Sequence, residues 1–329
     1  SEERFTWLKE IGAEVFATPG CESNVKEIYD KAKELLAERG DTIVNMNQFE
    51  QFGNPIWHYA VTGPAMEEVF VQNKGTNGRF AGMFLTQGSA GTLGAAEYLK
   101  EKYPLMKLSV GEALQCPTLL YNGFGGHRIE GIGDKHVPWV HNIKTMDMAA
   151  GIDDAVVIST MRLFNEPEGH KYLREAGVDS KVIDKLHLLG ISSIANIMGT
   201  IKMAKYYEMT EDDILFTVAT DSMEMYQSRV KEYRQLEGEY TQQQAAIDFT
   251  GKFLNIPIDH QIELTYYDKK RMHNLKYFTW IEQQGKTVEE LNAQWYDPNY
   301  WTNKWSQVDE WDRLINEFNE RTGLLKGLK

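Results

Sequence analysis

Helical and strand-like patterns of apolar residues alternate through the first part of the chain. Residues 2–10 predict a helix, and residues 13–17 predict a short strand. Ser23 or Asn24 is then expected to cap a second helix that ends at Gly40. The apolar positions of this helix recur every three or four residues: Val25, Ile28, Tyr29, Ala32, Leu35 and Leu36.

The alternation continues toward the middle of the chain. Residues 42–46 predict a strand, and a helix is expected to start near Pro64. Residues 79–85 and 105–110 predict two more strands, with a helix through Leu99 between them. Strands that alternate with helices are typical of βαβ units, so we predict an α/β fold with a parallel sheet.

A glycine-rich stretch, residues 115–142, interrupts this order, and so long an irregular segment inside a domain is usually functional. After it we predict a strand near residues 155–158 and helices around 160–175. A helix over 191–207 and a strand over 214–219 complete the alternating part.

Beyond about residue 235 the sequence predicts a helical, polar and aromatic tail. Thr287 and Glu290 have the spacing of a capping box. One helical face near the end is apolar: Val308, Trp311, Leu314, Ile315 and Phe318. We expect the aromatic residues of the tail to cover the main domain or a dimer partner, and the alternative is that its tryptophans bind a ligand.

Composition and charge narrow the function. The net charge of -13 argues against a nucleic-acid partner, which needs many Lys and Arg residues against its phosphates. No run approaches the ~20 apolar residues of a membrane span. The two cysteines, Cys21 and Cys116, cannot build a disulfide framework, so we expect a cytoplasmic protein.

The strongest local motif is the loop Thr86-Gln87-Gly88-Ser89-Ala90-Gly91-Thr92, which follows an apolar strand and opens a helix. Small residues let the backbone approach a ligand, and the amides at the helix start suit a phosphate. A tight turn also needs glycine, so the loop alone leaves both interpretations open. Its spacing fits neither the Walker pattern nor GxGxxG.

A second motif, Gly190-Ile191-Ser192-Ser193, opens the helix predicted over 191–207. For an isolated helix start, Ser192 or Ser193 is most simply an N-cap. This interpretation requires no ligand.

Other sites are less well supported. His127, His136 and His141 match no zinc spacing, so we expect them to bond the backbone and predict no metal. A serine hydrolase would need a G-x-S-x-G elbow, which is absent. A nicotinamide-binding enzyme would need an acidic residue after a GxGxxG unit, which is absent too.

Five blocks together resemble one family in the same order. The blocks are SEERFTWLKEIGAEVFATPG, then NQF with NP, His58 and TGP, then GSAGTLGAAEYLKEKYP, GGHRIEGIGDKHVP and GISSIANIMGTIKMAK. They resemble cysteine synthase and the fold-type II pyridoxal-phosphate enzymes, and the resemblance covers residues 1 to about 226.

The resemblance implies roles for individual positions. It places the cofactor phosphate of pyridoxal 5'-phosphate on the loop Gly88, Ser89, Ala90, Gly91 and Thr92. It also implies that the Ser192 hydroxyl bonds the pyridine nitrogen. For the substrate it implies Gln48, with Phe49 beside it, and the turn Gly131, Ile132 and Gly133. His58 is expected to serve packing or a hinge.

The departures from the family are equally informative. The Schiff-base lysine motif and the S-G-N-T-G loop of the family do not occur, so we predict no catalytic lysine in this chain. Where the family has glycine, this chain has Ala90 and Ile194. We expect the chain to be the C-terminal part of a longer enzyme, truncated at its N-terminus.

The expected fold is therefore the three-layer tryptophan synthase beta-like fold, with parallel or mixed sheets and a helical C-terminal extension. We expect residues 1–60 to belong to a small mobile domain, 61–235 to form the large cofactor-binding domain, and 236–329 to form the extension. The expected activity is that of a lyase or transferase, β-elimination or β-replacement on a small amino acid, by a homodimer. The alternative is a non-catalytic binding or regulatory subunit.

Overall fold

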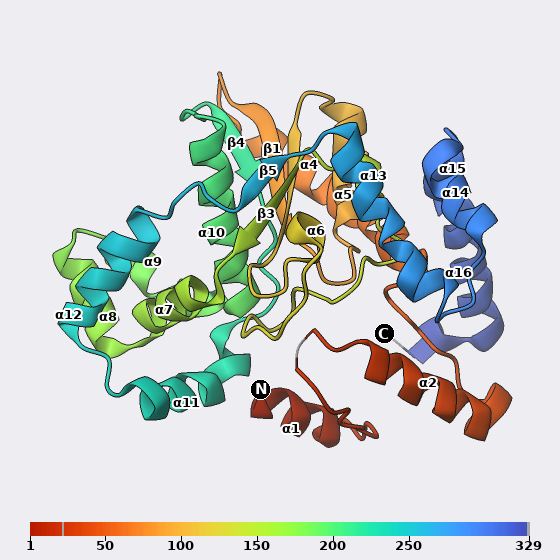
Figure 1. Ribbon diagram of the computed structural model, residues 1–329, viewed down its shortest axis with the longest axis horizontal. Coiled ribbons are helices and arrows are strands. Elements are labelled where there is room, and N and C mark those ends of the chain that lie inside the picture. The colour runs from red at the N-terminus through yellow and green to blue at the C-terminus, as the bar shows by residue number, and fades with distance from the viewer. Residues whose placement is uncertain (22, 328–329) are drawn as a thin grey trace.

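The computed structural model describes residues 1–21 and 23–327, and its centre is one five-stranded sheet of order β4-β1-β2-β3-β5 (Figure 1). The first four strands in this order are parallel, and β5 joins the edge of β3 antiparallel. Their bounds are Arg79–Thr86 for β1, Lys107–Ala113 for β2, Met148–Ile152 for β3, Asp213–Phe216 for β4 and Gln261–Glu263 for β5.

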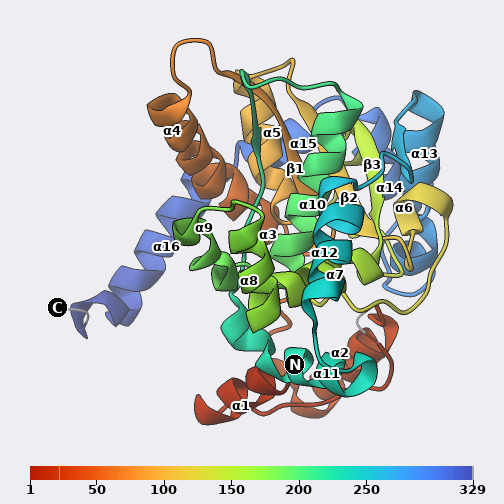
Figure 2. The ribbon, with the colours of Figure 1, turned by 90° about the vertical axis from the view of Figure 1, so that its left-hand side faces the viewer.

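The inner strands are apolar on both faces because helices cover both sides of the sheet. Along β1, Phe84 packs into one hydrophobic core, whereas its neighbours Met83 and Leu85 pack into the other. Figures 1 and 2 show the helices on the two sides, so the expected three-layer α/β fold is confirmed.

The helices of the first side are α7 (Asp154–Asn165), α8 (Pro167–Glu175) and α10 (Ile191–Tyr206). Their apolar residues meet the sheet around Phe84. The second side carries α4 (Gly63–Asn73), α5 (Leu93–Lys102) and α13 (Tyr266–Asn274). The last of these belongs to the tail, so the tail does contribute to the main core, through Met272.

The other helices are short or lie at the periphery. The α-helices are α1 Glu2–Glu10, α2 Lys26–Arg39, α3 Gly53–Trp57, α6 Thr118–Tyr121, α9 Ser180–Ile183, α11 Gln227–Glu237, α12 Gln242–Ile247, α14 Val288–Tyr296, α15 Tyr300–Trp305 and α16 Val308–Thr322. The 3-10 turns are η1 Gly40–Thr42, η3 Ile143–Thr145, η4 Leu186–Leu188, η5 Met223–Tyr226 and η8 Leu324–Gly327. The π-helical turns are η2 His58–Thr62, η6 Asp248–Leu254 and η7 Tyr277–Ile281.

Three of the expected strands are wrong. Residues 13–17 and 42–46 are irregular and largely exposed, because no described strand lies beside them to complete their hydrogen bonds. The third, at 155–158, lies inside α7, and the real strand β3 comes before it. There Asp153 caps the helix, accepting a hydrogen bond from the backbone N–H of Ala155 at 2.9 Å.

The start of α2 also differs from the expectation. Neither Ser23 nor Asn24 caps it, because the Ser23 hydroxyl donates to the carbonyl of Gly125 at 2.7 Å and Asn24 bonds Glu27 at 3.1 Å. Its end at Gly40 is confirmed, since Gly40 is the C-cap with a φ of 54°.

The tail is helical as expected, apart from strand β5. Thr287 caps α14 by accepting from the backbone N–H of Glu290 at 3.1 Å, but the Glu290 carboxylate accepts from the Tyr300 hydroxyl at 3.0 Å instead of closing the capping box. Helix α16 projects from the body (Figure 2), and Leu314, Ile315 and Phe318 on it are exposed. None of the helices in the described ranges is long and apolar enough to cross a membrane.

The contact of α10 with the sheet allows a test of this packing. A methyl group added at Gly199 would overlap the ring of Phe84, which is fully buried. Gly199→Ala is therefore expected to lower the free energy of unfolding by about 1–3 kcal/mol, measured by urea denaturation.

Gly251→Ala is the matched control, because nothing lies within 4 Å of the added methyl there. A Gly199→Ala variant as stable as this control would contradict the close packing of α10 on β1.

Candidate cofactor site

A cavity of about 290 Å³ opens at the C-terminal ends of β1 and β4. After β1 the chain adds β2 and β3 on one side, and then returns to place β4 on the other side of β1. This makes the gap between β1 and β4 a topological switch point, where ligands of open α/β sheets bind. Residues at the end of β1 and after β4 line this cavity, including Thr86, Val218 and Thr220.

The predicted phosphate loop forms one wall, and all of Gly88, Ser89, Ala90, Gly91 and Thr92 line the cavity. Within residues 1–21 and 23–327, no group accepts a hydrogen bond from the backbone N–H groups of this loop. These N–H groups lie at the N-terminus of α5, where the helix dipole is positive. The loop is thus a ready site for an anion.

The Asn54 side chain holds the loop in place. Its Nδ2 donates to the Ser89 hydroxyl and to the Gln48 carbonyl, each at 3.0 Å. A methyl group at Gly91 would overlap this amide, so glycine is needed for the close approach. Ala90, where the family has glycine, adopts a φ of 64°, a conformation that side chains with a Cβ seldom take.

Two further predicted residues meet this wall from other elements. Gly131 lines the cavity with a φ of 93°, and a Cβ built on it would lie 3.7 Å from the Ser192 hydroxyl oxygen. A Cβ built on Gly88 would lie 3.2 Å from the Gly131 carbonyl oxygen. The loop, the Gly131 turn and the start of α10 therefore converge at one cavity.

Neither serine of the second motif is the helix cap. The N-cap of α10 is Gly190, and no side chain caps it. The Ser192 hydroxyl lies 2.9 Å from the Thr220 hydroxyl and lines the cavity, whereas Ser193 Oγ accepts from the Thr220 backbone N–H at 3.1 Å. Ser192 is thus available to a ligand, and Ser193 holds the chain after β4.

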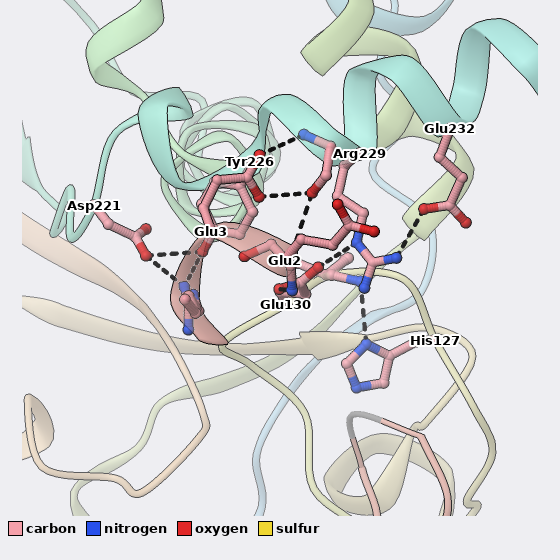
Figure 3. Close-up of polar contacts among 12 residues, drawn as sticks. Glu2, Glu3, His127, Glu130, Asp221, Tyr226, Arg229 and Glu232 are labelled. Carbon is pink, nitrogen blue, oxygen red and sulfur yellow. Dashed lines mark hydrogen bonds and ion pairs between the residues drawn. The ribbon is translucent and has the colours of Figure 1, made fainter. Parts of the chain in front are cut away.

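Sequence reasoning missed several residues of the cavity wall, among them Arg4, Asn196, Thr220 and Asp221. Asp221 accepts from the Tyr226 hydroxyl at 2.8 Å and pairs with Arg4 of α1. Figure 3 shows Asp221 and Tyr226 directed toward each other below α11. No local pattern signals this group, because Arg4 and Asp221 are 217 residues apart in the sequence.

Asn196 gives an independent sign of a polar ligand. Its Nδ2 donates to the Val218 carbonyl at 2.8 Å, but its Oδ1 is buried and has no hydrogen-bond partner among the described residues. Buried polar atoms are nearly always satisfied by protein, water or ligand. Asn196 lines the cavity, so a water molecule or a ligand with a donor group can complete the hydrogen bonding of its Oδ1.

His58 lies at the cavity as a neutral group. Burial lowers the pKa of His58, and its Nδ1 lies 2.9 Å from the Thr62 hydroxyl. The expectation that His58 serves only packing or a hinge did not foresee that it would line the cavity.

The remaining predicted residues do not line this cavity. Gln48 is exposed and reaches the loop only through Asn54, and Phe49 packs edge-on against Tyr29. Ile132 is buried in a core, and the Gly133 backbone N–H donates to Gln87 at 2.7 Å. Their predicted contact with the substrate stays a prediction.

Each of the three histidines in the glycine-rich segment has a different hydrogen-bond partner. His127 Nε2 lies 2.9 Å from the Gly133 carbonyl, His136 Nε2 lies 3.1 Å from the Tyr29 hydroxyl, and His141 Nδ1 lies 2.8 Å from Gln87 Oε1. The described part of the chain contains no group of three or more His, Cys, Asp or Glu residues that could hold a metal ion.

Comparison with known proteins identifies the family. No family model matches the chain. The chain is 32% identical over 231 residues to a cysteine synthase of Staphylococcus aureus, which is 69% of this chain and 65% of that protein. It is 30% identical over 234 residues to a probable cysteine synthase of Bacillus subtilis, covering 69% and 66%. The chain thus spans just under two thirds of the length of these relatives.

Solved structures agree. An O-acetylserine dependent cystathionine beta-synthase from Helicobacter pylori aligns with a TM-score of 0.53 at 27% identity, over 69% of this chain and 66% of that one. A hydrogen sulfide-producing enzyme from Fusobacterium nucleatum aligns with a TM-score of 0.55 at 25% identity, over 69% and 68%.

The chain has an α/β fold with a cavity at its switch point, and the relatives specify the family. The chain belongs to the fold-type II pyridoxal-phosphate family, which includes the cysteine synthases. This is a family of pyridoxal-phosphate-dependent lyases and transferases.

The tether between Asn54 and the loop can be tested by a double-mutant cycle. Gly91→Ala is expected to lower the free energy of unfolding by about 1–3 kcal/mol, because the methyl displaces the Asn54 amide. In an Asn54→Ala background the same change should cost less by at least about 0.5 kcal/mol, measured by urea denaturation.

If Gly91→Ala lowers the free energy of unfolding by the same amount in both backgrounds, the Asn54 amide does not limit the space beside Gly91.

Proposed function

We propose that this chain binds pyridoxal 5'-phosphate for β-elimination or β-replacement on a small amino acid. One observation carries the proposal. Backbone N–H groups of Gly88–Thr92, which have no acceptor among the described residues, line the same cavity at the switch point as the Ser192 hydroxyl.

The residues of this cavity fit the cofactor. A Cβ at Gly88 or Gly91 would crowd the loop, and the unpartnered Oδ1 of Asn196 marks space for a polar group. In this proposal the loop amides and the N-terminus of α5 hold the phosphate, with the Ser89 and Thr92 hydroxyls near it. Once bound, the cofactor supplies an electron sink for bonds at the amino-acid substrate.

Ser192 is the proposed partner of the pyridine nitrogen. The Thr220 hydroxyl at 2.9 Å orients the Ser192 hydroxyl. The nearby carboxylate, Asp221, is engaged by Arg4 and Tyr226. A neutral hydroxyl therefore faces the ring position, and a neutral partner leaves the pyridine unprotonated, as suits elimination and replacement at Cβ.

The substrate is assigned by the same proposal to the Gln48 and Gly131–Gly133 segments, with its carboxylate near Gln48. The bond from Asn54 to the Gln48 carbonyl supports this, because it ties the segment to the phosphate loop. A cytoplasmic location and a homodimer complete the proposal.

One observation favours the second candidate, a binding or regulatory subunit without catalysis. None of the described residues that line the cavity is a lysine. Borohydride reduction of the cofactor-loaded protein, followed by peptide mass spectrometry, separates the candidates. A pyridoxyl group attached to a lysine of this chain would reject the second candidate.

The two serines should separate cofactor binding from stability. Ser192→Ala is expected to raise the Kd for pyridoxal phosphate about three- to tenfold, the effect of one lost hydrogen bond, with little change in stability. Ser193→Ala should instead lower the free energy of unfolding by about 1 kcal/mol, because the Thr220 N–H loses its acceptor. Fluorescence titration and urea denaturation measure the two effects.

If the wild type and Ser192→Ala bind the cofactor with equal affinity, Ser192 does not contact it.

Gly88→Val tests the phosphate loop directly. The valine Cβ would lie 3.2 Å from the Gly131 carbonyl, and its branches would fill the space before the amides. We expect at least about a tenfold weaker affinity for both pyridoxal phosphate and inorganic phosphate, measured by calorimetry.

Pyridoxal without its phosphate is the control ligand, and its affinity should change less. Unchanged phosphate affinity in a folded Gly88→Val variant would place the phosphate elsewhere.

A further inference from the structure

A buried lysine in the tail, Lys276, contacts the glycine-rich segment of the main domain. It is 0% exposed and follows α13. Its Nζ donates to the Trp139 carbonyl at 2.9 Å, to the His141 carbonyl at 2.7 Å and to Gln294 Oε1 at 2.6 Å. The three acceptors match the three N–H bonds of an ammonium group.

Burial alone would not place a lysine here, because it lowers the pKa of Lys276 and disfavours the charge. The three acceptors oppose that effect, and the rings of Trp139 and Trp301 lie 5.8 and 5.5 Å from Nζ. Such rings attract a cation. A buried charge with this set of partners fixes the positions of the groups that surround it.

His141 continues the contact toward the cofactor loop. Its carbonyl accepts from Lys276, and its ring Nδ1 lies 2.8 Å from Gln87 Oε1. An amide oxygen only accepts, so Nδ1 carries the proton. Burial and the nearby Lys276 lower the pKa of His141, which keeps the ring neutral.

Gln87 is the residue directly before the phosphate loop. It is 0% exposed, its backbone N–H donates to Gly111 at 2.7 Å, and its carbonyl accepts from Gly133 at 2.7 Å. Its side chain is thus the contact by which His141 fixes the backbone from which the loop leaves β1.

We propose that Lys276 and His141 are positioning residues that hold the phosphate loop through Gln87. The tail then supports the cofactor site, although none of its described residues lines the cavity. The inference rests on the proposed phosphate site and adds a residue outside the segment that resembles cysteine synthase.

The tail has a second anchor that bonds neither His141 nor the Gln87 side chain directly, which supplies a control. Trp280 Nε1 donates to the Val137 carbonyl at 2.8 Å. Trp280→Phe removes this bond and leaves the Lys276–His141–Gln87 contacts in place. Lys270→Met is a second control, because the Lys270 ammonium lies over the rings of Trp295 and Tyr296, at 4.8 and 4.6 Å.

The test compares phosphate affinity across five variants of the full chain. Lys276→Met and His141→Leu should raise the Kd for inorganic phosphate and for pyridoxal phosphate about tenfold, as lost outer contacts of a site do. His141→Asn, whose amide can donate in place of Nδ1, should stay within about threefold of the wild type. The two controls should bind like the wild type.

Calorimetry gives the affinities, and the ³¹P resonance of bound pyridoxal phosphate gives a signature of loop geometry. That resonance should shift in Lys276→Met and His141→Leu, and not in Trp280→Phe. Where Lys276→Met does not fold, the pair His141→Leu and His141→Asn decides.

Three negative results have different meanings. Wild-type affinity and resonance in Lys276→Met and His141→Leu would overturn the inference and leave the proposed function intact. An equal loss of phosphate affinity in Trp280→Phe would also overturn the inference. It would show that any loosening of the tail weakens the site. A wild-type chain that binds neither phosphate nor pyridoxal phosphate would overturn both proposals.

Discussion

The backbone N–H groups at the bend from β1 to α5 are the constraint on which the site depends. In the proposed site they bind a ligand, which requires that the loop does not close on itself and carries no large side chains. Glycine at positions 88 and 91 meets the second condition, and the Asn54 tether meets the first by holding the loop from outside. Ala90 shows how tightly the backbone is set, since an alanine there is held at a φ of 64°.

The sheet topology brings the other groups to this bend. Because β4 returns beside β1, the turn after β4 carries Thr220 and Asp221 to the cavity, and the start of α10 brings Ser192. Polar groups in this region are kept in defined states by their neighbours: Asp221 by Arg4 and Tyr226, and His141 by burial and Lys276. The site is therefore built from elements that are distant in sequence and close in the fold.

The tail gives the clearest example of long-range organisation. Its tryptophans agree with the expectation that they cover the main domain. Four of them are buried: Trp280, Trp295, Trp301 and Trp305. The bonds of Lys276 show that this cover reaches the backbone beside the phosphate loop, through His141 and Gln87. A lysine among aromatic residues looks like a surface residue in the sequence, and only its neighbours in space show otherwise.

The sequence by itself determined the features that depend on near neighbours along the chain: helices such as α1 and α10, strand β1, and the glycine loop after it. These follow from periodicity and turn chemistry, which act over a few residues. Strands at 13–17 and 42–46 failed because a strand also needs a partner. Only the tertiary structure could decide that Ser192 lines a cavity while Ser193 binds the backbone, or that Arg4 meets Asp221. Those contacts join residues far apart in the chain, and their energy depends on burial and distance, which no local pattern contains.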